Sequence, residues 1–190
     1  MPVMESIVNL LEKDTGLNAI NKPGGQHVLN DEYFKRIEAI NYTLEHDDGE
    51  GQKNLELADV IIVGVSRTSK TPTCIYLANK GIKAANYPLV PDIGVSKELD
   101  EVKSPTVVAL ITSAQTLVEI RRKRSLELGL KDKETDYINV HKVEEEIIAA
   151  KRIFANKGWP VIDITRRSVE ETASAIMNII SLKEKKENEQ

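Results

Sequence analysis

The sequence predicts an α/β fold in which a mostly parallel sheet is flanked by helices on both faces, with a short N-terminal helical appendage. Unbroken apolar runs such as ADVIIVGV (58–65) are typical of strands that are covered on both faces. These runs alternate with segments whose apolar residues recur at helical spacing, which gives a βαβ rhythm along the chain. No repeat of fixed period appears, so a solenoid is not indicated.

The bulk composition favours one soluble domain. At 190 residues the chain is long enough for a real core, and its formal charge of −4 gives no reason to expect nucleic acid or an acidic membrane as a partner. The single cysteine, Cys74, excludes an internal disulfide framework and fits a reducing compartment. No signal-peptide pattern and no apolar run of the ~18 residues that a membrane span needs is present, so we expect a cytoplasmic location.

The chain is predicted to divide into three parts. Residues 1–29 form an N-terminal stub and linker, because a weakly amphipathic stretch is followed by a segment rich in glycine and proline. Residues 30–182 form the main domain, and residues 183–190, rich in charged side chains, are expected to be a frayed tail.

The main domain is expected to open with a helix. Asn30 is a plausible N-cap, and the helix should end near EHDDGEG (45–51). Four apolar residues at i, i+4, i+7 and i+11 predict its buried stripe: Tyr33, Ile37, Ile40 and Leu44.

The next elements follow the alternating pattern. After the strand at 58–65, a helix at 71–81 carries Pro72 in its first turn and ends at Gly81. A strand at 82–89, a short helix at 96–102, a strand at 106–112 and a long helix at 113–128 are then predicted.

The C-terminal part is predicted as helix, strand, helix. The first helix places Val143, Ile147, Ala150 and Phe154 on one face, and a strand follows at 159–165. The last helix places Val169, Ala173, Ile176 and Ile180 on its core stripe. Ser168 and Glu171 have the spacing of a capping box at its start.

The stretch GVSRTSKT (64–71) matches the phosphate-loop pattern G-x-x-x-x-G-K-[ST], except that Ser69 stands where the second glycine is expected. In such a loop, backbone amides and the helix start offer partial positive charge to phosphate oxygens, and Lys70 adds a full charge. The Thr71 hydroxyl can reach a magnesium ion. The alternative, a tight turn with an exposed lysine, is disfavoured because a buried strand precedes the loop and a helix follows it.

The sequence therefore predicts a P-loop-containing domain whose loop binds phosphate. The expected binding residues are Gly64, Val65, Ser66, Arg67, Thr68, Ser69, Lys70 and Thr71. Lys70 is also the first candidate catalytic residue, and Thr71 is the candidate metal ligand.

Two acidic residues before the loop are further candidates. Asp47 and Asp48 lie at a helix C-terminus, where their charge is unfavourable for the helix dipole. Either could be a general base for a hydroxyl nucleophile or a magnesium ligand. The alternative is that both belong to a solvated turn and have no functional role. We expect one of them to point toward the phosphate loop.

Basic residues elsewhere could meet a phosphate group. Arg121 and Arg124 are three apart on one helix, hence on one face, and could contact a second phosphate or an acidic partner. Arg166 and Arg167 follow a strand at the sheet edge where α/β folds bind ligands, so one could face the site. His27, in a loop with glycines, is given no role.

Four segments together carry a family resemblance: 23–49, 58–91, 119–125 and 163–177. They resemble the pyruvate, phosphate dikinase regulatory proteins, a bifunctional kinase and pyrophosphorylase family that includes the regulators of phosphoenolpyruvate synthase. The runs GVSRTSKTP and AANYPLVP are specific, whereas a bare phosphate loop is not. Family members carry a further N-terminal segment before the matched region, which bears on dimerisation and target docking.

The resemblance implies a serine/threonine protein kinase that uses ADP, and a phosphorylase that uses orthophosphate and releases pyrophosphate. The target would be a threonine of pyruvate, phosphate dikinase, or of phosphoenolpyruvate synthase, beside a catalytic histidine that carries a phosphoryl group. ADP, orthophosphate and Mg²⁺ are thus the implied small molecules, and a homodimer stays open. Two alternatives also stay open: an ATP-dependent small-molecule kinase, and a catalytically inactive nucleotide-binding module.

Overall fold

The computed structural model describes residues 3–18, 30–47, 54–127 and 136–188. The chain divides into two compact units, Met1–Tyr33 and Phe34–Gln190. In the first unit, helix α1 (Val3–Thr15) ends where the amide of Gly16, at φ 68°, donates to the Glu12 carbonyl. The predicted N-terminal helical appendage is therefore present.

The second unit is built on a four-stranded sheet in the order β2-β1-β3-β4, and all three strand pairings are parallel. The strands are β1 (Val60–Gly64), β2 (Ala84–Pro88), β3 (Thr106–Ile111) and β4 (Val161–Asp163). Every residue of β1 is buried, as its unbroken apolar run predicted. The two central strands, β1 and β3, contribute residues to two hydrophobic clusters.

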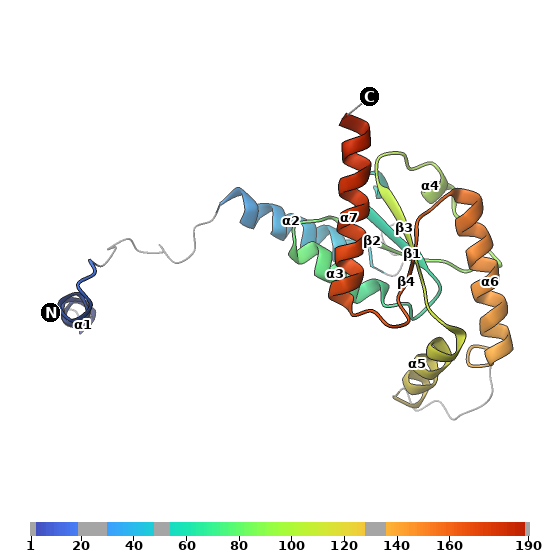
Figure 1. Ribbon diagram of the computed structural model, residues 1–190, viewed down its shortest axis with the longest axis horizontal. Helices are drawn as coiled ribbons and strands as arrows, with labels where there is room; N and C mark the ends of the chain where they lie inside the picture. Colours follow the sequence, from blue (N-terminus) through green and yellow to red (C-terminus); the bar gives the residue numbers. More distant parts are fainter. Residues whose placement is uncertain (1–2, 19–29, 48–53, 128–135, 189–190) are drawn as a thin grey trace. The chain divides into compact units, whose positions relative to one another are not determined.

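Helices cover both faces of this sheet (Figure 1). On one face α3 (Lys70–Asn79) and α7 (Val169–Asn188) pack against Val60, Ile62 and Val108. On the other face α5 (Ala114–Glu127) and α6 (Val140–Lys157) pack with the short helix α4 (Lys97–Asp100) and the 3₁₀ turn η1 (Leu55–Leu57). The predicted fold class, a parallel sheet between two helical layers, is confirmed.

The C-terminal helices use the faces that the sequence predicted. The four-residue stripe of α6 is buried, with Val143 and Phe154 wholly inaccessible to solvent. At the start of α7, the Ser168 hydroxyl accepts from the Glu171 amide and the Glu171 carboxylate accepts from the Ser168 amide, which confirms the capping box. The helix continues to Asn188, so most of the segment expected to be a frayed tail is helical, in line with the good helix propensity of lysine and glutamate.

Helix α2 (Asp31–Glu45) begins as predicted but buries a different face. The Asn30 side chain caps it by accepting a hydrogen bond from the Tyr33 amide. The predicted apolar stripe is wrong: Ile37 is 39% exposed and Leu44 is 63% exposed. The buried positions also have helical spacing and are Ala39, Tyr42, Thr43 and, just beyond the helix, His46.

The reason is the kind of contact that α2 makes with the sheet. The Thr43 hydroxyl donates to the Ala84 carbonyl in the edge strand β2, and the Ala84 amide donates back to the same hydroxyl. A polar side chain therefore faces the strand edge, where unpaired backbone groups need partners. Apolar spacing alone does not reveal this face.

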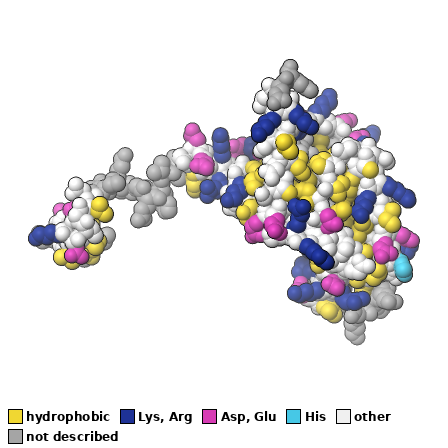
Figure 2. Space-filling model, viewed as in Figure 1, with side chains coloured by type: hydrophobic (Ala, Val, Ile, Leu, Met, Phe, Trp, Pro, Cys, Tyr) yellow, Lys and Arg dark blue, Asp and Glu magenta, His cyan; other side chains and the backbone are white. Residues whose placement is uncertain are grey.

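Charged residues are spread over the surface. On the face of the molecule in Figure 2, basic and acidic side chains are interspersed rather than gathered into a patch of one sign. Within the described ranges, no helix combines the length and apolar character that crossing a bilayer requires.

Candidate phosphate-binding site

The candidate site lies at the carboxyl end of β1, where the chain turns into α3. A pocket of about 320 Å³ opens there, lined by residues 66–72 together with Asn86, Pro88 and Ile120. Parallel α/β sheets bind ligands at this edge, outside the carboxyl ends of their strands. The loop predicted from the sequence therefore forms most of the lining of this pocket.

Two residues of the loop have left-handed backbone conformations: Arg67, at φ 73°, and Ser69, at φ 53°. Ser69 occupies the position where the pattern expects glycine, and it adopts the conformation that glycine would have adopted freely. At the loop entrance, a Cβ on Gly64 would lie 2.8 Å from both the Leu110 carbonyl oxygen and the Thr68 hydroxyl. Gly64 is thus required by close packing, while Ser69 is a strained substitute.

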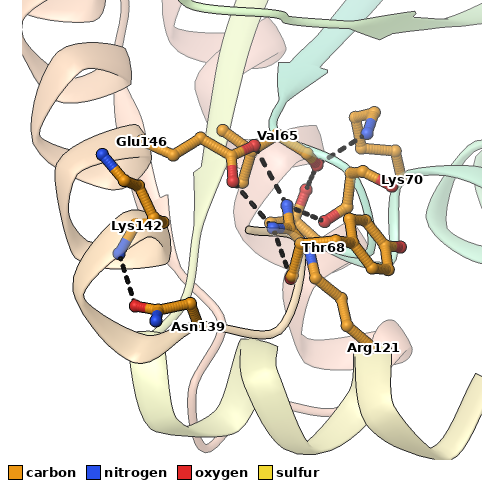
Figure 3. Close-up of polar contacts among 9 residues, drawn as sticks. Val65, Thr68, Lys70, Arg121, Asn139, Lys142 and Glu146 are labelled. Carbon is orange, nitrogen blue, oxygen red and sulfur yellow. Dashed lines mark hydrogen bonds and ion pairs between the residues drawn. The ribbon is translucent and has the colours of Figure 1, made fainter. Parts of the chain in front are cut away.

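The loop is held closed by side chains that bond to its own backbone. The Lys70 ammonium donates to the Val65 carbonyl at 3.0 Å, and the Thr68 hydroxyl donates to the same oxygen at 2.9 Å (Figure 3). Lys70 is only 5% exposed and Thr68 is fully buried. Lys70 therefore lies folded into the loop, with its charge at the start of α3 where a phosphate would bind.

An acidic residue from the end of α2 meets the loop. The Thr71 hydroxyl donates to Asp47 Oδ1 at 3.0 Å, and the Asn86 side-chain amide donates to that oxygen at 2.7 Å and to the Thr71 hydroxyl at 3.0 Å. The expectation that one aspartate faces the loop is confirmed for Asp47. Asp48 and His27 lie outside the described residues.

Asn86 is a site residue that the sequence analysis missed. It is 3% exposed in the middle of β2, next to the buried residues Ala85 and Tyr87. A signal was present, because asparagine is depleted in strands and a buried one needs partners. Its side chain joins β2, the end of α2 and the start of α3 at a single point.

Oxygen atoms suited to magnesium occur at this point. Among the described residues no group of three or more His, Cys, Asp or Glu side chains forms a cage for a metal ion. Magnesium does not need one, because it is held by one or two carboxylates together with substrate phosphates and water. The Thr71 hydroxyl and the Asp47 carboxylate, 3.0 Å apart beside the pocket, fit that requirement.

Cys74 lies behind the site in α3 and is fully buried. Burial raises the pKa of its thiol, the charge of Asp47 raises it further, and the charge of Lys70 opposes the shift. Burial thus favours the neutral form of the thiol, which is the less reactive form.

The two arginines expected to share a face have different surroundings. Arg121 is 2% exposed and is bound through both terminal nitrogens to the Glu146 carboxylate, with one of them also donating to the Ser66 carbonyl. Arg124 is 46% exposed and pairs with Glu127 at the surface, at 3.5 Å. Arg121 thus contacts the phosphate loop from outside the pocket.

The other basic pair lines a separate cavity. Arg166 and Arg167 lie with Ser113, Asp163 and Thr165 around about 550 Å³ of space at the carboxyl ends of β3 and β4. Hydrogen bonds from the Thr165 hydroxyl and amide lower the pKa of Asp163. This pair does not line the phosphate-loop pocket.

Comparisons with known proteins identify the family of the chain. Residues 1–177 match the model of a family described as kinase/pyrophosphorylase. Provisionally named pyruvate, phosphate dikinase regulatory proteins are similar: one from Caulobacter vibrioides at 51% identity over 94% of this chain, and one from Sphingopyxis alaskensis at 49% over 93%. Another, from Rhodopseudomonas palustris (strain HaA2), is 46% identical over 95% of this chain.

The aligned region spans 56% of the Caulobacter protein and 65% of each of the other two. This chain thus corresponds to somewhat more than half of the length of these relatives. The family match covers most of the chain and includes the whole phosphate loop with Asp47 and Asn86. The chain belongs to the kinase/pyrophosphorylase family.

Proposed function

We propose that this chain transfers phosphoryl groups between a diphosphate and a protein threonine, using ADP in one direction and orthophosphate in the other. The observation that carries the proposal is one pocket lined by a phosphate loop that includes Lys70 and Thr71, with Asp47 bonded to the Thr71 hydroxyl beside it. The loop and Lys70 bind diphosphate charge, and the pair of Thr71 and Asp47 adds oxygen ligands or a base.

In the kinase direction, the threonine oxygen attacks the β-phosphorus of ADP. A new bond forms between phosphorus and that oxygen, the bond from phosphorus to the α–β bridging oxygen breaks, and AMP leaves. Lys70 and the amides at the start of α3 stabilise the charge of the transferred group. The threonine proton passes to a base, for which Asp47 is the candidate within the described residues.

In the phosphorylase direction, an orthophosphate oxygen attacks the phosphorus of phosphothreonine. The bond from phosphorus to the threonine oxygen breaks, pyrophosphate leaves, and the threonine oxygen takes up a proton. Pyrophosphate and ADP share a P–O–P group with negatively charged oxygens on both phosphorus atoms, which supports the use of one loop in both directions. When bound at Thr71 and Asp47, Mg²⁺ would neutralise part of the diphosphate charge.

The relatives support a proposal for the protein substrate. Their names make them regulators of pyruvate, phosphate dikinase. We propose the same target for this chain, modified on the threonine beside its phosphohistidine, with phosphoenolpyruvate synthase as the other member of the target class. Threonine phosphorylation there places a dianion near the catalytic histidine and blocks it by charge and bulk.

The test is a two-step reaction with purified components. The chain is incubated with the phosphohistidine form of pyruvate, phosphate dikinase and ADP labelled at the β-phosphate, and the label is located by mass spectrometry. Unlabelled orthophosphate is then added. We expect label on a threonine in the first step and labelled pyrophosphate in the second. A reaction without the chain is the control.

Other outcomes distinguish the alternatives. Transfer from ATP to small molecules, with none to the dikinase, would indicate a small-molecule kinase. Binding of ADP with no transfer in either direction would indicate a nucleotide-binding module. Label on phosphoenolpyruvate synthase alone would keep the chemistry and change the target.

A further inference from the structure

The guanidinium of Arg121 joins three parts of the second unit. Its terminal nitrogens bond to the Glu146 carboxylate on α6 at 2.7 Å and 3.0 Å, to the Ser66 carbonyl at 3.2 Å and to the Tyr137 carbonyl at 3.3 Å (Figure 3). The guanidinium carbon also lies 4.5 Å from the centre of the Tyr137 ring. A buried charge needs this degree of pairing.

These contacts leave the guanidinium little capacity for a phosphate. Its two terminal nitrogens carry four hydrogens, and each nitrogen donates two hydrogen bonds in the structure, so all four hydrogens are used. The remaining N–H, on Nε, is buried without a hydrogen-bond partner. Direct phosphate binding would therefore require Arg121 to release Glu146 or the loop.

The contact with Ser66 has a geometric consequence for the loop. A trans peptide is planar, so the Ser66 carbonyl and the Arg67 amide point in opposite directions. Holding that carbonyl against the guanidinium turns the Arg67 amide away from Arg121. Ser66 itself lies between two spaces, because it lines both the phosphate-loop pocket and a larger cavity of about 650 Å³ that Arg121 and Glu146 also line.

We propose that Arg121 and Glu146 act as a positioning pair that orients the Ser66–Arg67 peptide so that its amide faces the phosphate. This inference rests on the proposed function, since it gives the pair a role in phosphate binding. Arg121 does not touch the substrate and acts only through the loop. The planar fork of arginine suits the task, because lysine cannot bond a carboxylate with two parallel hydrogen bonds while also reaching Ser66.

The test uses Arg121→Lys and Glu146→Gln, the double variant, and two matched controls. Arg122→Lys makes the same change at an exposed position on α5, and Glu145→Gln does so at an exposed position on α6. Each protein is titrated with inorganic pyrophosphate by calorimetry. Thermal unfolding without ligand and amide spectra of ¹⁵N-labelled protein are recorded in parallel.

We expect Arg121→Lys and Glu146→Gln to weaken pyrophosphate binding by about 10–100-fold each, since small misplacements of binding groups have effects of this size. The double variant should be no weaker than the worse single variant, because the two residues act as a unit. The Arg67 amide resonance should shift in both variants without ligand. In the kinase assay, both variants should show a higher KM for ADP and a lower kcat. Both controls should match the wild type.

Three results would overturn the proposal that Arg121 and Glu146 position the loop. Unchanged pyrophosphate affinity in both variants would show that the pair has no role in phosphate binding. A large loss in Arg121→Lys with none in Glu146→Gln would indicate direct phosphate contact. Weaker binding with an unmoved Arg67 resonance would exclude action through the loop. If Arg121→Lys does not fold, the pyrophosphate affinity and the Arg67 resonance of Glu146→Gln alone test the pair, and unchanged affinity or an unmoved resonance overturns it. A wild-type chain that fails to bind pyrophosphate would instead overturn the proposed function, and this inference with it.

Discussion

The Thr71 hydroxyl donates a hydrogen bond to Asp47 Oδ1 at 3.0 Å, across 24 residues of sequence. Thr71 belongs to the start of α3 and Asp47 to the turn after α2, so two segments with no shared secondary structure meet at the phosphate loop. Asn86 bonds to both residues and fixes their separation. The pair places a carboxylate beside the phosphate loop, where the proposed reaction would use a base or a metal ligand.

Replacing Asp47 with asparagine should therefore reduce threonine phosphorylation by at least about 10²-fold. If the carboxylate is the base, the affinity for ADP is kept and only kcat falls. If it is a metal ligand, the Mg²⁺ concentration needed for half-maximal rate rises as well. Initial rates over a magnesium titration separate the two roles. Asp100→Asn, an exposed change on α4, is the control, and a near wild-type rate for Asp47→Asn would leave the carboxylate as part of a structural turn.

Replacing Lys70 with alanine should abolish both directions, with a loss of at least about 10²-fold in each, because its charge stabilises the phosphoryl group whichever way it moves. Thermal unfolding should show an intact fold. Lys80→Ala, at the exposed end of α3, removes the same charge away from the loop and serves as the control. A variant that loses the kinase direction alone would contradict a shared site.

Replacing Ser69 with glycine should leave the protein as stable or raise its free energy of unfolding by up to about 1 kcal/mol, because the left-handed backbone strains a residue with a Cβ. Ser69→Val should lower it by about 1 kcal/mol or more. Urea unfolding measures both. Ser174 is an exposed residue within α7, and replacing it with glycine should lower the free energy of unfolding. The serine-to-glycine change should therefore have opposite effects on stability at the two positions.

Cys74 should resist alkylation in the folded protein. Burial raises the pKa of its thiol, so the folded state holds less of the reactive thiolate than the unfolded state at any given pH. As the pH rises from 7 to 9, the rate of alkylation by iodoacetamide should rise steeply for the protein unfolded in urea and stay low for the folded protein in buffer. At pH 8 the two rates should differ by a factor on the order of 100. Because this is the only cysteine, total alkylation reports it directly. Equal rates in buffer and urea would show that α3 opens readily.

Local patterns in the sequence were enough to predict most of the helices and strands and the phosphate loop. The unbroken apolar run 60–63 favoured a strand covered on both faces, and it forms the fully buried central strand β1. The stripe of α6 was readable because its buried residues recur at helical spacing. The capping box of α7 was readable because its two partners are only three residues apart. The glycine, lysine and threonine of the loop were likewise local, since a phosphate loop is built from consecutive residues.

Which distant residues contact that loop depends on how the strands and helices pack in three dimensions. Asn86 reaches Asp47 and Thr71 only because β2 lies beside β1 in the sheet, and Arg121 reaches Ser66 only because α5 and α6 pack on the same face. The buried face of α2 was settled in the same way, by the bonding of Thr43 to an edge strand. Periodicity records where apolar area is buried, whereas these contacts are polar and long-range, and polar partners are set by strand order and helix packing.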